Sequence, residues 1–201
     1  LCSRGCGSTD PVLLAVGTKA DQKGFDRLVR WWIPLAQADA GLQLVIVGLD
    51  ELPYHGRDQQ ADLRALLVYQ PELQARLHFP GRVGNMGDWY VRAQLFVLSS
   101  RYEGFPNVLL EAMAAGCCCV AADCPHGPAD LIQDGVNGRL LPDTASDAQW
   151  VQVLTVLLAD RVERQCLAAK AMEVRELYAP AALQQRMTQA LERLMREAVA
   201  S

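Results

Sequence analysis

The chain has 201 residues, of which 51% are hydrophobic and 21% are charged, so it is long enough to bury a core and has a globular composition. Its formal net charge of −4 excludes a protein built around a basic stripe for nucleic acid, because phosphate neutralisation needs such a stripe. No run of roughly 18 or more apolar residues occurs, so we expect no transmembrane segment. Because the chain begins with Leu1 rather than Met, we expect a fragment or a processed protein.

Short apolar runs alternate with stretches of helical spacing along the chain. The predicted strands are 12–16, 42–47, 77–79, 95–98, 117–121 and 139–141. The predicted helices are 24–32, 59–69, 88–93, 107–115, 128–133, 148–159, 162–177 and 181–198. This alternation predicts an α/β fold with a Rossmann-like, doubly wound parallel sheet that has helices on both faces, and ligands then bind at the carboxyl ends of the strands.

We expect an irregular N-terminal segment at 1–11 and a single domain at 12–201. The domain ends in the helix at 181–198, whose apolar stripe is most simply read as docked on the rest of the domain. The adjacent Trp31 and Trp32 point about 100° apart on a helix, which favours packing over a platform for sugar.

Seven cysteines are present, and three of them are consecutive in the predicted strand 117–121. Adjacent strand residues face opposite ways, so these three cannot bind one metal ion together. We expect these three cysteines to be small buried hydrophobic residues in a reducing compartment. His55 and His78 lack metal-like spacing with their neighbours, and we predict no metal site.

The loop after the first strand carries Gly17, Thr18, Lys19 and, four residues later, Lys23. It has neither a Gly-x-Gly-x-x-Gly fingerprint nor a Walker sequence, which argues against a dehydrogenase or a kinase. The chain has three lysines and sixteen arginines, yet two of the lysines fall in this one loop. Lysines at a ligand-binding edge can neutralise a diphosphate, although ordinary exposed lysines are the alternative.

The most informative segment runs from Ser99 to Gly116, where a loop joins an apolar strand to a helix. Gly104 lacks a Cβ where a ligand could approach, and Pro106 fits a first helical turn, whose unpaired amides favour an anion. Glu111 stands among apolar neighbours, where burial would cost several kcal/mol without a donor. The simpler alternative makes Glu103 a loop charge and Glu111 a solvated helix residue.

This segment resembles the signature of retaining GT-B glycosyltransferases of the "group one" type: Glu-Gly-Phe-Pro-Asn at 103–107 is followed by Glu-Ala-Met-Ala-Ala-Gly at 111–116. The Gln-Lys-Gly-Phe-Asp sequence at 22–26 looks like the family's Lys-Gly element. The resemblance implies the C-terminal, nucleotide-sugar-binding half of such an enzyme. It also implies transfer of a sugar from a nucleotide-diphosphate donor with retention of configuration, without a tightly bound metal or cofactor.

Site residues follow from the same resemblance. Lys23 would stabilise the leaving diphosphate, Glu103 would orient sugar hydroxyls and Glu111 would accept a hydrogen bond from the ribose. Lys23 and Glu103 are thus the implied catalytic residues. The implied donor-binding positions are Gly17, Thr18, Lys19, Lys23, Arg82, Val83, Glu103, Gly104, Phe105, Pro106, Asn107, Val108 and Glu111.

Two departures from the family pattern and one further motif concern the rest of the expected donor site. Thr18 stands where the family usually has Arg, and Lys19 is the candidate substitute. The Phe-Pro-Gly-Arg-Val turn at 79–83 resembles a nucleobase-reading element, in which Arg82 either stacks on the base or is an ordinary surface arginine. Asp50 follows Val-Gly-Leu where the family often has Gly-x-Gly, and it would narrow that loop.

The Cys-Pro-His-Gly-Pro sequence at 124–128 resembles one branch of the family, which commonly has Glu where this chain has Asp130. His126 is a candidate general base by ordinary pKa, but a loop residue that shapes the sugar pocket is the favoured reading, because no carboxylate partner is evident nearby.

The expected partners are a nucleotide sugar and an N-terminal acceptor domain of the same full-length enzyme, which would supply any peripheral membrane contact. In the enzymes that this chain resembles, a C-terminal helix crosses back to the N-terminal domain, which implies the alternative that the apolar stripe at 181–198 is partly uncovered here. We expect a cytoplasmic location, which includes the inner face of the membrane. Two alternatives remain: a nucleotide-sugar epimerase of GT-B architecture and a non-catalytic sugar-nucleotide-binding module. The Glu-Gly-Phe-Pro sequence argues against the first, and Lys23 together with the two glutamates argues against the second.

Overall fold

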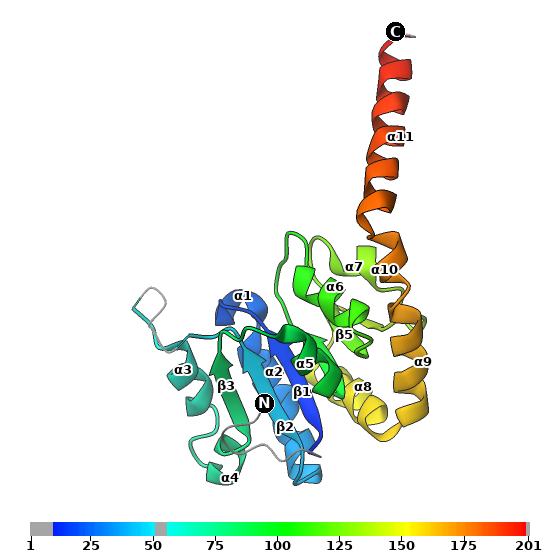
Figure 1. The fold of residues 1–201 in the computed structure, drawn as a ribbon. Coiled ribbons are helices and arrows are strands. Elements are labelled where there is room, and N and C mark those ends of the chain that lie inside the picture. The colour runs from blue at the N-terminus through cyan, green and yellow to red at the C-terminus, as the bar shows by residue number, and fades with distance from the viewer. Residues whose placement is uncertain (1–9, 51–55, 200–201) are drawn as a thin grey trace.

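The computed structural model describes residues 10–50 and 56–199, and within them six parallel strands form one sheet (Figure 1). The strands are β1 Val12–Val16, β2 Gln43–Val47, β3 Leu77–Gly81, β4 Leu95–Leu98, β5 Cys119–Asp123 and β6 Arg139–Pro142. Their order across the sheet is β3-β2-β1-β4-β5-β6. The predicted doubly wound parallel fold is therefore confirmed.

Helices cover both faces of this sheet. They are α1 Ala20–Lys23, α2 Phe25–Ala38, α3 Gln59–Ala65, α4 Pro71–Gln74, α5 Met86–Arg92, α6 Asn107–Ala114, α7 Pro128–Leu131, α8 Asp147–Ala159, α9 Arg161–Ala171, α10 Val174–Leu177 and α11 Pro180–Val199. Alternate strand residues divide the core, because successive side chains point to opposite faces. Leu13 packs with α2 and α8 on one face, whereas Leu14 packs with α5 and α6 on the other.

Several element boundaries differ from the sequence prediction. β5 begins at Cys119 rather than at 117, because the Cys117 amide still donates to the Ala112 carbonyl at the end of α6. α2 continues past Pro34 to Ala38, since buried Leu35 holds the next turn on the core. The predicted helix 162–177 is two helices, α9 and α10, and the helix expected at 59–69 ends at Ala65.

The predicted burial of the three consecutive cysteines is confirmed. Cys117, Cys118, Cys119 and Cys124 are buried thiols, and burial raises the pKa of the Cys124 thiol to about 11. Cys166 is exposed on α9. The remaining two cysteines lie outside the described residues. The tryptophan prediction holds: Trp31 and Trp32 are both buried, and Trp31 stacks on Trp150 with ring centroids 4.1 Å apart.

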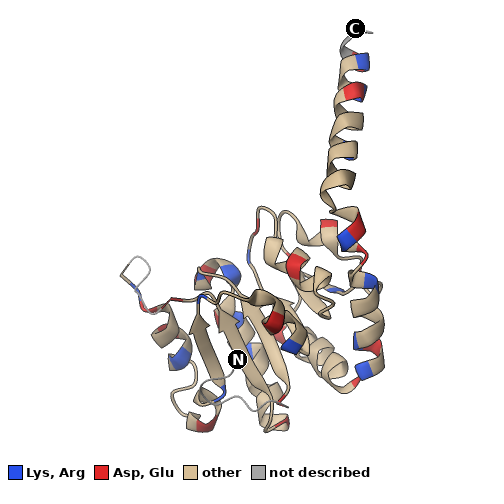
Figure 2. Ribbon diagram, viewed as in Figure 1, with Lys and Arg blue, Asp and Glu red and all other residues tan. Residues whose placement is uncertain are grey.

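Helix α11 projects away from the body of the domain and is not docked on it, contrary to the simplest reading of its apolar stripe (Figure 1). Leu183, Met187, Leu191 and Leu194 of the stripe are exposed. Arg186 ties the start of the helix to α10 through the Leu177 carbonyl. Acidic and basic residues are interspersed on α9 and α11 rather than separated by sign (Figure 2). In the described part of the chain, no helix is long and apolar enough to cross a membrane.

Candidate functional site

The candidate site lies where the winding of the sheet reverses. β1 and β4 are neighbours, and the chain leaves β1 for α2 on one face and β4 for α6 on the other. Loops that diverge in this way leave a crevice at the carboxyl ends of the two strands, which is the usual ligand position in open α/β sheets. The lysine loop follows β1 and the Glu-Gly-Phe-Pro loop follows β4, so the structure brings both predicted elements to this edge.

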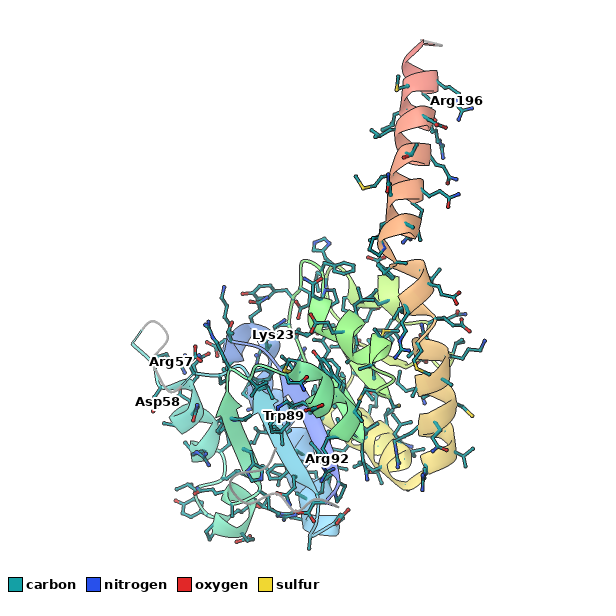
Figure 3. All side chains as sticks on the ribbon, viewed as in Figure 1. Lys23, Arg57, Asp58, Trp89, Arg92 and Arg196 are labelled. Atoms are coloured by element: carbon teal, nitrogen blue, oxygen red, sulfur yellow. The ribbon has the colours of Figure 1, made fainter. Side chains whose placement is uncertain are left out.

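Lys23 and Glu103 contact each other directly at this edge. The Lys23 Nζ atom lies 2.7 Å from Glu103 Oε1, and only 15% of the lysine side chain and 5% of the glutamate side chain are exposed. The expectation that Glu103 is a simple loop charge is therefore wrong. Figure 3 shows Lys23, the last residue of α1, at the end of the sheet that this short helix covers. A buried carboxylate is tolerated here because a cation and a hydroxyl both donate to it.

The serine pair at the end of β4 positions both members of this ion pair. Ser100 Oγ donates to Glu103 Oε1 at 2.5 Å, and Ser99 Oγ donates to the Lys23 carbonyl at 2.7 Å. Both serines are buried. Arg27 on α2 donates in turn to the Ser99 and Ser100 carbonyls, so the end of the strand is fully engaged by hydrogen bonds.

Two glycines make this close packing possible. A Cβ on Gly24 would lie 2.1 Å from the Ser99 carbonyl oxygen, and Gly24 has φ +62°, which other residues rarely adopt. A Cβ on Gly17 would lie 2.6 Å from Lys23 Cγ, so the bare backbone of Gly17 lets the lysine stem cross the end of β1. The glycines therefore decide how near Lys23 lies to the strand ends.

The loop from Gly104 to Val108 leads into α6. Pro106 is the N-cap residue and α6 begins at Asn107. The expectation that Pro106 lies in the first helical turn is therefore wrong by one residue. No side chain caps the helix. The Asn107 and Leu109 amides donate to the Phe105 and Pro106 carbonyls, which leaves the Val108 amide as the first-turn donor open to an anion at this edge. Gly104, Phe105 and Asn107 are exposed there, whereas Pro106 is buried against Gly127.

Glu111 is not buried among its apolar neighbours, and the simpler reading of it as a solvated helix residue agrees with the structure. Its residue is exposed, and the Tyr90 hydroxyl donates to Oε2 at 3.0 Å. The buried stripe of α6 consists of Leu109, Ala112 and Met113, which puts position 111 on the opposite side of the helix. Glu111 is thus an available acceptor beside the crevice rather than a buried charge.

Three of the other predicted donor-binding residues, Thr18, Lys19 and Arg82, are exposed. Thr18 and Lys19 are exposed in the first loop. Arg82 forms an exposed ion pair with Asp50 at 3.1 Å, and Val83 packs beside the core on the same turn. The pairing joins the turn at 79–83 to the loop that Asp50 was expected to narrow.

His126 is exposed and has φ +66°, and it is the one residue other than glycine with positive φ in the described ranges. Its neighbour Pro125 accepts a hydrogen bond from the Glu103 amide at 3.2 Å. The loop is therefore fixed against the Glu103 segment, and Asp130 nearby is exposed on α7. The described ranges hold no group of three or more His, Cys, Asp or Glu side chains arranged to bind a metal ion.

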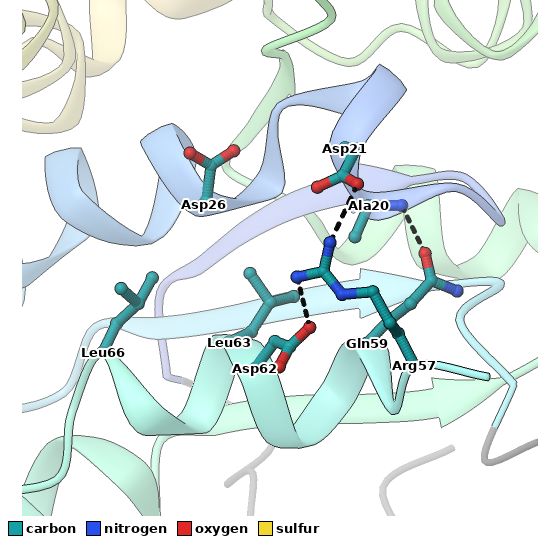
Figure 4. Close-up of a pocket in the computed structure, with 8 residues that line it drawn as sticks. All are labelled: Ala20, Asp21, Asp26, Arg57, Gln59, Asp62, Leu63 and Leu66. Atoms are coloured by element: carbon teal, nitrogen blue, oxygen red, sulfur yellow. Dashed lines mark hydrogen bonds and ion pairs between the residues drawn. The ribbon is translucent and has the colours of Figure 1, made fainter. Parts of the chain in front are cut away.

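Some site residues were missed by sequence reasoning. Arg27 and Tyr90 reach their partners across distant parts of the chain, for which single-sequence spacing carries no signal. The polar Ser99–Ser100 pair after an apolar strand was a usable signal for buried donors. A cavity of about 370 Å³ on the outer side of α1 was also not predicted, and its lining includes Ala20, Arg57 and Gln59 (Figure 4).

Comparison with known proteins identifies the family of this chain. The family model described as "Glycosyl transferases group 1" matches residues 10–160. The amylovoran biosynthesis glycosyltransferase AmsD of Erwinia amylovora is 30% identical over 168 residues, which are 84% of this chain and 44% of AmsD. This chain therefore spans less than half the length of that relative.

Solved structures share the fold. Anabaena Alr3699/HepE in complex with UDP has a TM-score of 0.80 at 22% identity, over 92% of this chain and 50% of that one. The C-terminal domain of the group 1 glycosyl transferase LpcC from Francisella tularensis has a TM-score of 0.72 at 22% identity, over 83% of this chain and 84% of that one. Because the family model covers most of the chain, the chain belongs to the glycosyl transferases group 1 family.

Proposed function

We propose that this chain is the donor-binding, C-terminal half of a retaining glycosyltransferase, which binds a nucleotide-diphosphate sugar and transfers the sugar to an acceptor held by an N-terminal domain. The coverage values support this division: the chain is under half the length of AmsD but nearly matches the isolated C-terminal domain of LpcC. Retention of configuration rests on the resemblance of the Glu103–Glu111 segment to retaining enzymes.

The observation that carries this proposal is the Lys23–Glu103 pair beside the uncapped start of α6, at the point where the sheet reverses. A cation and a helix start with an open amide at one edge suit a diphosphate, since each compensates negative charge. A carboxylate and a serine hydroxyl at the same edge suit sugar hydroxyls. The arrangement thus provides for both parts of a nucleotide sugar.

The residues divide the work as follows. On donor binding, the Lys23 ammonium exchanges part of its contact with Glu103 for the diphosphate, and it stabilises the charge that develops as the diphosphate leaves. Glu103 then has an oxygen available for sugar hydroxyls, while Ser100 holds its carboxyl group in place. Glu111 accepts from the ribose, and the amides near 105–108 hold phosphate and sugar.

Binding of nucleoside diphosphates to the chain by calorimetry tests this proposal, with UDP as the first probe because the HepE neighbour holds it. Lys23→Ala should weaken binding by about 1 to 3 kcal/mol, as expected for a lost charge-assisted hydrogen bond. Lys170→Ala is the matched control, because Lys170 pairs with Glu173 on the surface of α9. Equal binding by wild type and Lys23→Ala would remove Lys23 from the site.

The two glutamates should separate in the same assay. Glu111→Gln should impair binding of the bare nucleoside diphosphate, whereas Glu103→Gln should spare it and reduce discrimination among nucleotide sugars. Similar losses of nucleoside diphosphate affinity in both variants would contradict these separate roles.

A radiolabelled transfer assay tests the half-enzyme part. GT-B transfer takes place between two domains that exclude water and align the acceptor, so this chain should bind the donor but leave acceptors unmodified until a matching N-terminal domain is added. Robust turnover by the chain alone would mean that it contains an acceptor site. Interconversion of nucleotide sugars without any acceptor would instead indicate an epimerase.

A further inference from the structure

Helix α1, which ends in Lys23, has little apolar anchoring, because only its Ala20 packs, partly buried, against the hydrophobic core. None of its four residues is buried, although it forms one wall of the donor crevice. A short helix with no buried side chain gains little from the hydrophobic effect, which positions most surface helices. Polar contacts must therefore fix where α1, and with it Lys23, lies.

Gln59 at the start of α3 supplies two of these contacts. Its Oε1 accepts the Ala20 amide at 2.6 Å, and its Nε2 donates to the Thr18 carbonyl at 3.2 Å (Figure 4). One side chain, from a position 39 residues further along the chain, thus engages the backbone on both sides of Lys19. It satisfies a first-turn amide that the short helix cannot satisfy itself.

Arg101 supplies the corresponding contacts on the other side. Its Nη1 donates to the Asp21 carbonyl at 2.6 Å and its amide donates to the Gln22 carbonyl at 2.8 Å. Its Nη2 is also within 2.8 Å of Asp26 at the start of α2. Arg101 therefore links the Glu103 loop to α1 through the backbone as well as through charge.

We infer that Gln59 and Arg101 are positioning residues, which hold α1 between α3 and the β4–α6 loop so that Lys23 meets the donor diphosphate. This inference rests on the proposed function, because it assigns Lys23 to the diphosphate. Neither side chain needs to touch the donor. Each acts through backbone groups of the segment from Thr18 to Gln22.

The chain contains a matched control in the same cavity. Arg57 spans from Asp21, at 3.5 Å, to Asp62, at 2.8 Å, and so also connects α1 with α3 (Figure 4). It contacts side chains that are largely exposed, however, and surface ion pairs of this kind contribute little. Arg57→Ala should therefore leave Lys23 in place, although it removes a connection between the same two helices.

UDP binding by calorimetry in a double-mutant cycle tests the inference. Gln59→Ala should weaken binding about tenfold, a change of about 1.4 kcal/mol, while Arg57→Ala should change it less than about twofold. Gln59→Glu keeps the acceptor for the Ala20 amide and should be intermediate. In a Lys23→Ala background, Gln59→Ala and Arg101→Ala should each add almost nothing, because residues that act through one group are not additive.

The outcomes are distinguishable. A full tenfold loss of UDP affinity from Gln59→Ala in the Lys23→Ala background would show that Gln59 acts independently of Lys23, and it would overturn the inference. Unchanged UDP affinity in the single variant Gln59→Ala would overturn it as well. Failure of the wild-type chain to bind any nucleoside diphosphate would overturn the proposed function instead. Hydrogen exchange of the amides at 19–24 without ligand gives a separate readout. We expect faster exchange in Gln59→Ala than in Arg57→Ala, and equal exchange would contradict the positioning role of Gln59.

Discussion

The two glutamates of one motif occupy opposite environments. Glu103 is buried, and it accepts from Lys23, 80 residues away in the chain, and from the nearby Ser100. Glu111 is exposed on the outer side of α6 and accepts from a single hydroxyl, that of Tyr90. The motif is therefore one unit in sequence but two regions in the folded protein.

The surroundings of Glu103 hold its carboxylate in position, whereas the carboxylate of Glu111 is accessible to a ligand. A carboxylate whose surroundings are fixed on every side costs little further entropy when it contacts a ligand, whereas an exposed carboxylate is available but must be ordered. We expect mutations near Glu103 to change both stability and binding, and mutations near Glu111 to change binding far more than stability. The following predictions test this contrast, from the largest expected effect to the smallest.

Gly24→Ala should have the largest effect on stability. The added Cβ would lie 2.1 Å from the Ser99 carbonyl oxygen at φ +62°, so the backbone of the Glu103 region must shift. We expect a loss of about 3 to 4 kcal/mol in the free energy of unfolding by urea, or failure to fold. Gly135→Ala is the control, because its φ of +73° gives the same strain but nothing lies within 4 Å of the added Cβ. Equal losses would show that the close approach at Gly24 is unimportant.

Lys23→Met should be next, because it leaves the Glu103 carboxylate buried without its cation. We expect a loss of about 2 to 3 kcal/mol, somewhat below the usual cost of breaking a fully buried pair since the lysine is partly exposed. The free energy of unfolding should recover in part when Glu103→Gln is added. Lys170→Met removes an exposed pair and should cost less than about 0.5 kcal/mol. No recovery in the double variant would argue that the stem of Lys23, not its charge, matters.

Tyr90→Phe tests the Glu111 region. It removes the hydrogen bond at 3.0 Å but keeps the buried ring, which packs edge-on against Phe96. Since water can replace the lost donor at an exposed carboxylate, the free energy of unfolding should fall by about 1 kcal/mol or less. Nucleoside diphosphate affinity should fall as well, because Glu111 loses its orienting contact. A stability loss as large as that of Lys23→Met would erase the contrast between the two regions.

A pH series should give the smallest effect. Burial raises the pKa of Asp26, but hydrogen bonds and charges from Arg101 and Arg30 outweigh it, so the pKa is below its ordinary value of 3.8. A carboxylate with a lowered folded-state pKa stabilises the protein above the unfolded-state value and loses that contribution as the pH falls through the folded-state value. Between about pH 5 and pH 3, wild type should lose more stability to urea than Asp26→Asn, with Asp130→Asn as the exposed control. Parallel pH profiles for wild type and Asp26→Asn would contradict this.

The sequence by itself determined the layers of the fold and the edge that carries the site. Runs such as Val12–Val16 and Leu95–Leu98 are apolar throughout, and only strands buried on both faces need such a pattern. The lysine loop and the Glu-Gly-Phe-Pro loop each follow such a strand directly, so local order along the chain was enough to place both at the carboxyl edge.

Some features were readable from the sequence but were interpreted wrongly. The spacing of Leu109, Ala112 and Met113 defines the buried stripe of α6, and it places Glu111 outside it. Counting apolar neighbours along the chain suggested burial instead, because neighbours in sequence point in different directions on a helix. For α11, the docked helix was the simpler of two readings and the exposed stripe agrees with the other, because periodicity shows only that a face is apolar and not whether anything covers it.

Only the tertiary structure decided which polar groups meet. Lys23 and Glu103 are 80 residues apart, Gln59 reaches back to Ala20, and Arg27 reaches the end of β4. Such contacts depend on how strands are ordered and how closely glycines let loops approach, and neither is written in the spacing of nearby residues. The hydrophobic pattern acts locally and so fixes the elements, whereas the ion pair and the contacts on α1 form only after distant elements have packed together.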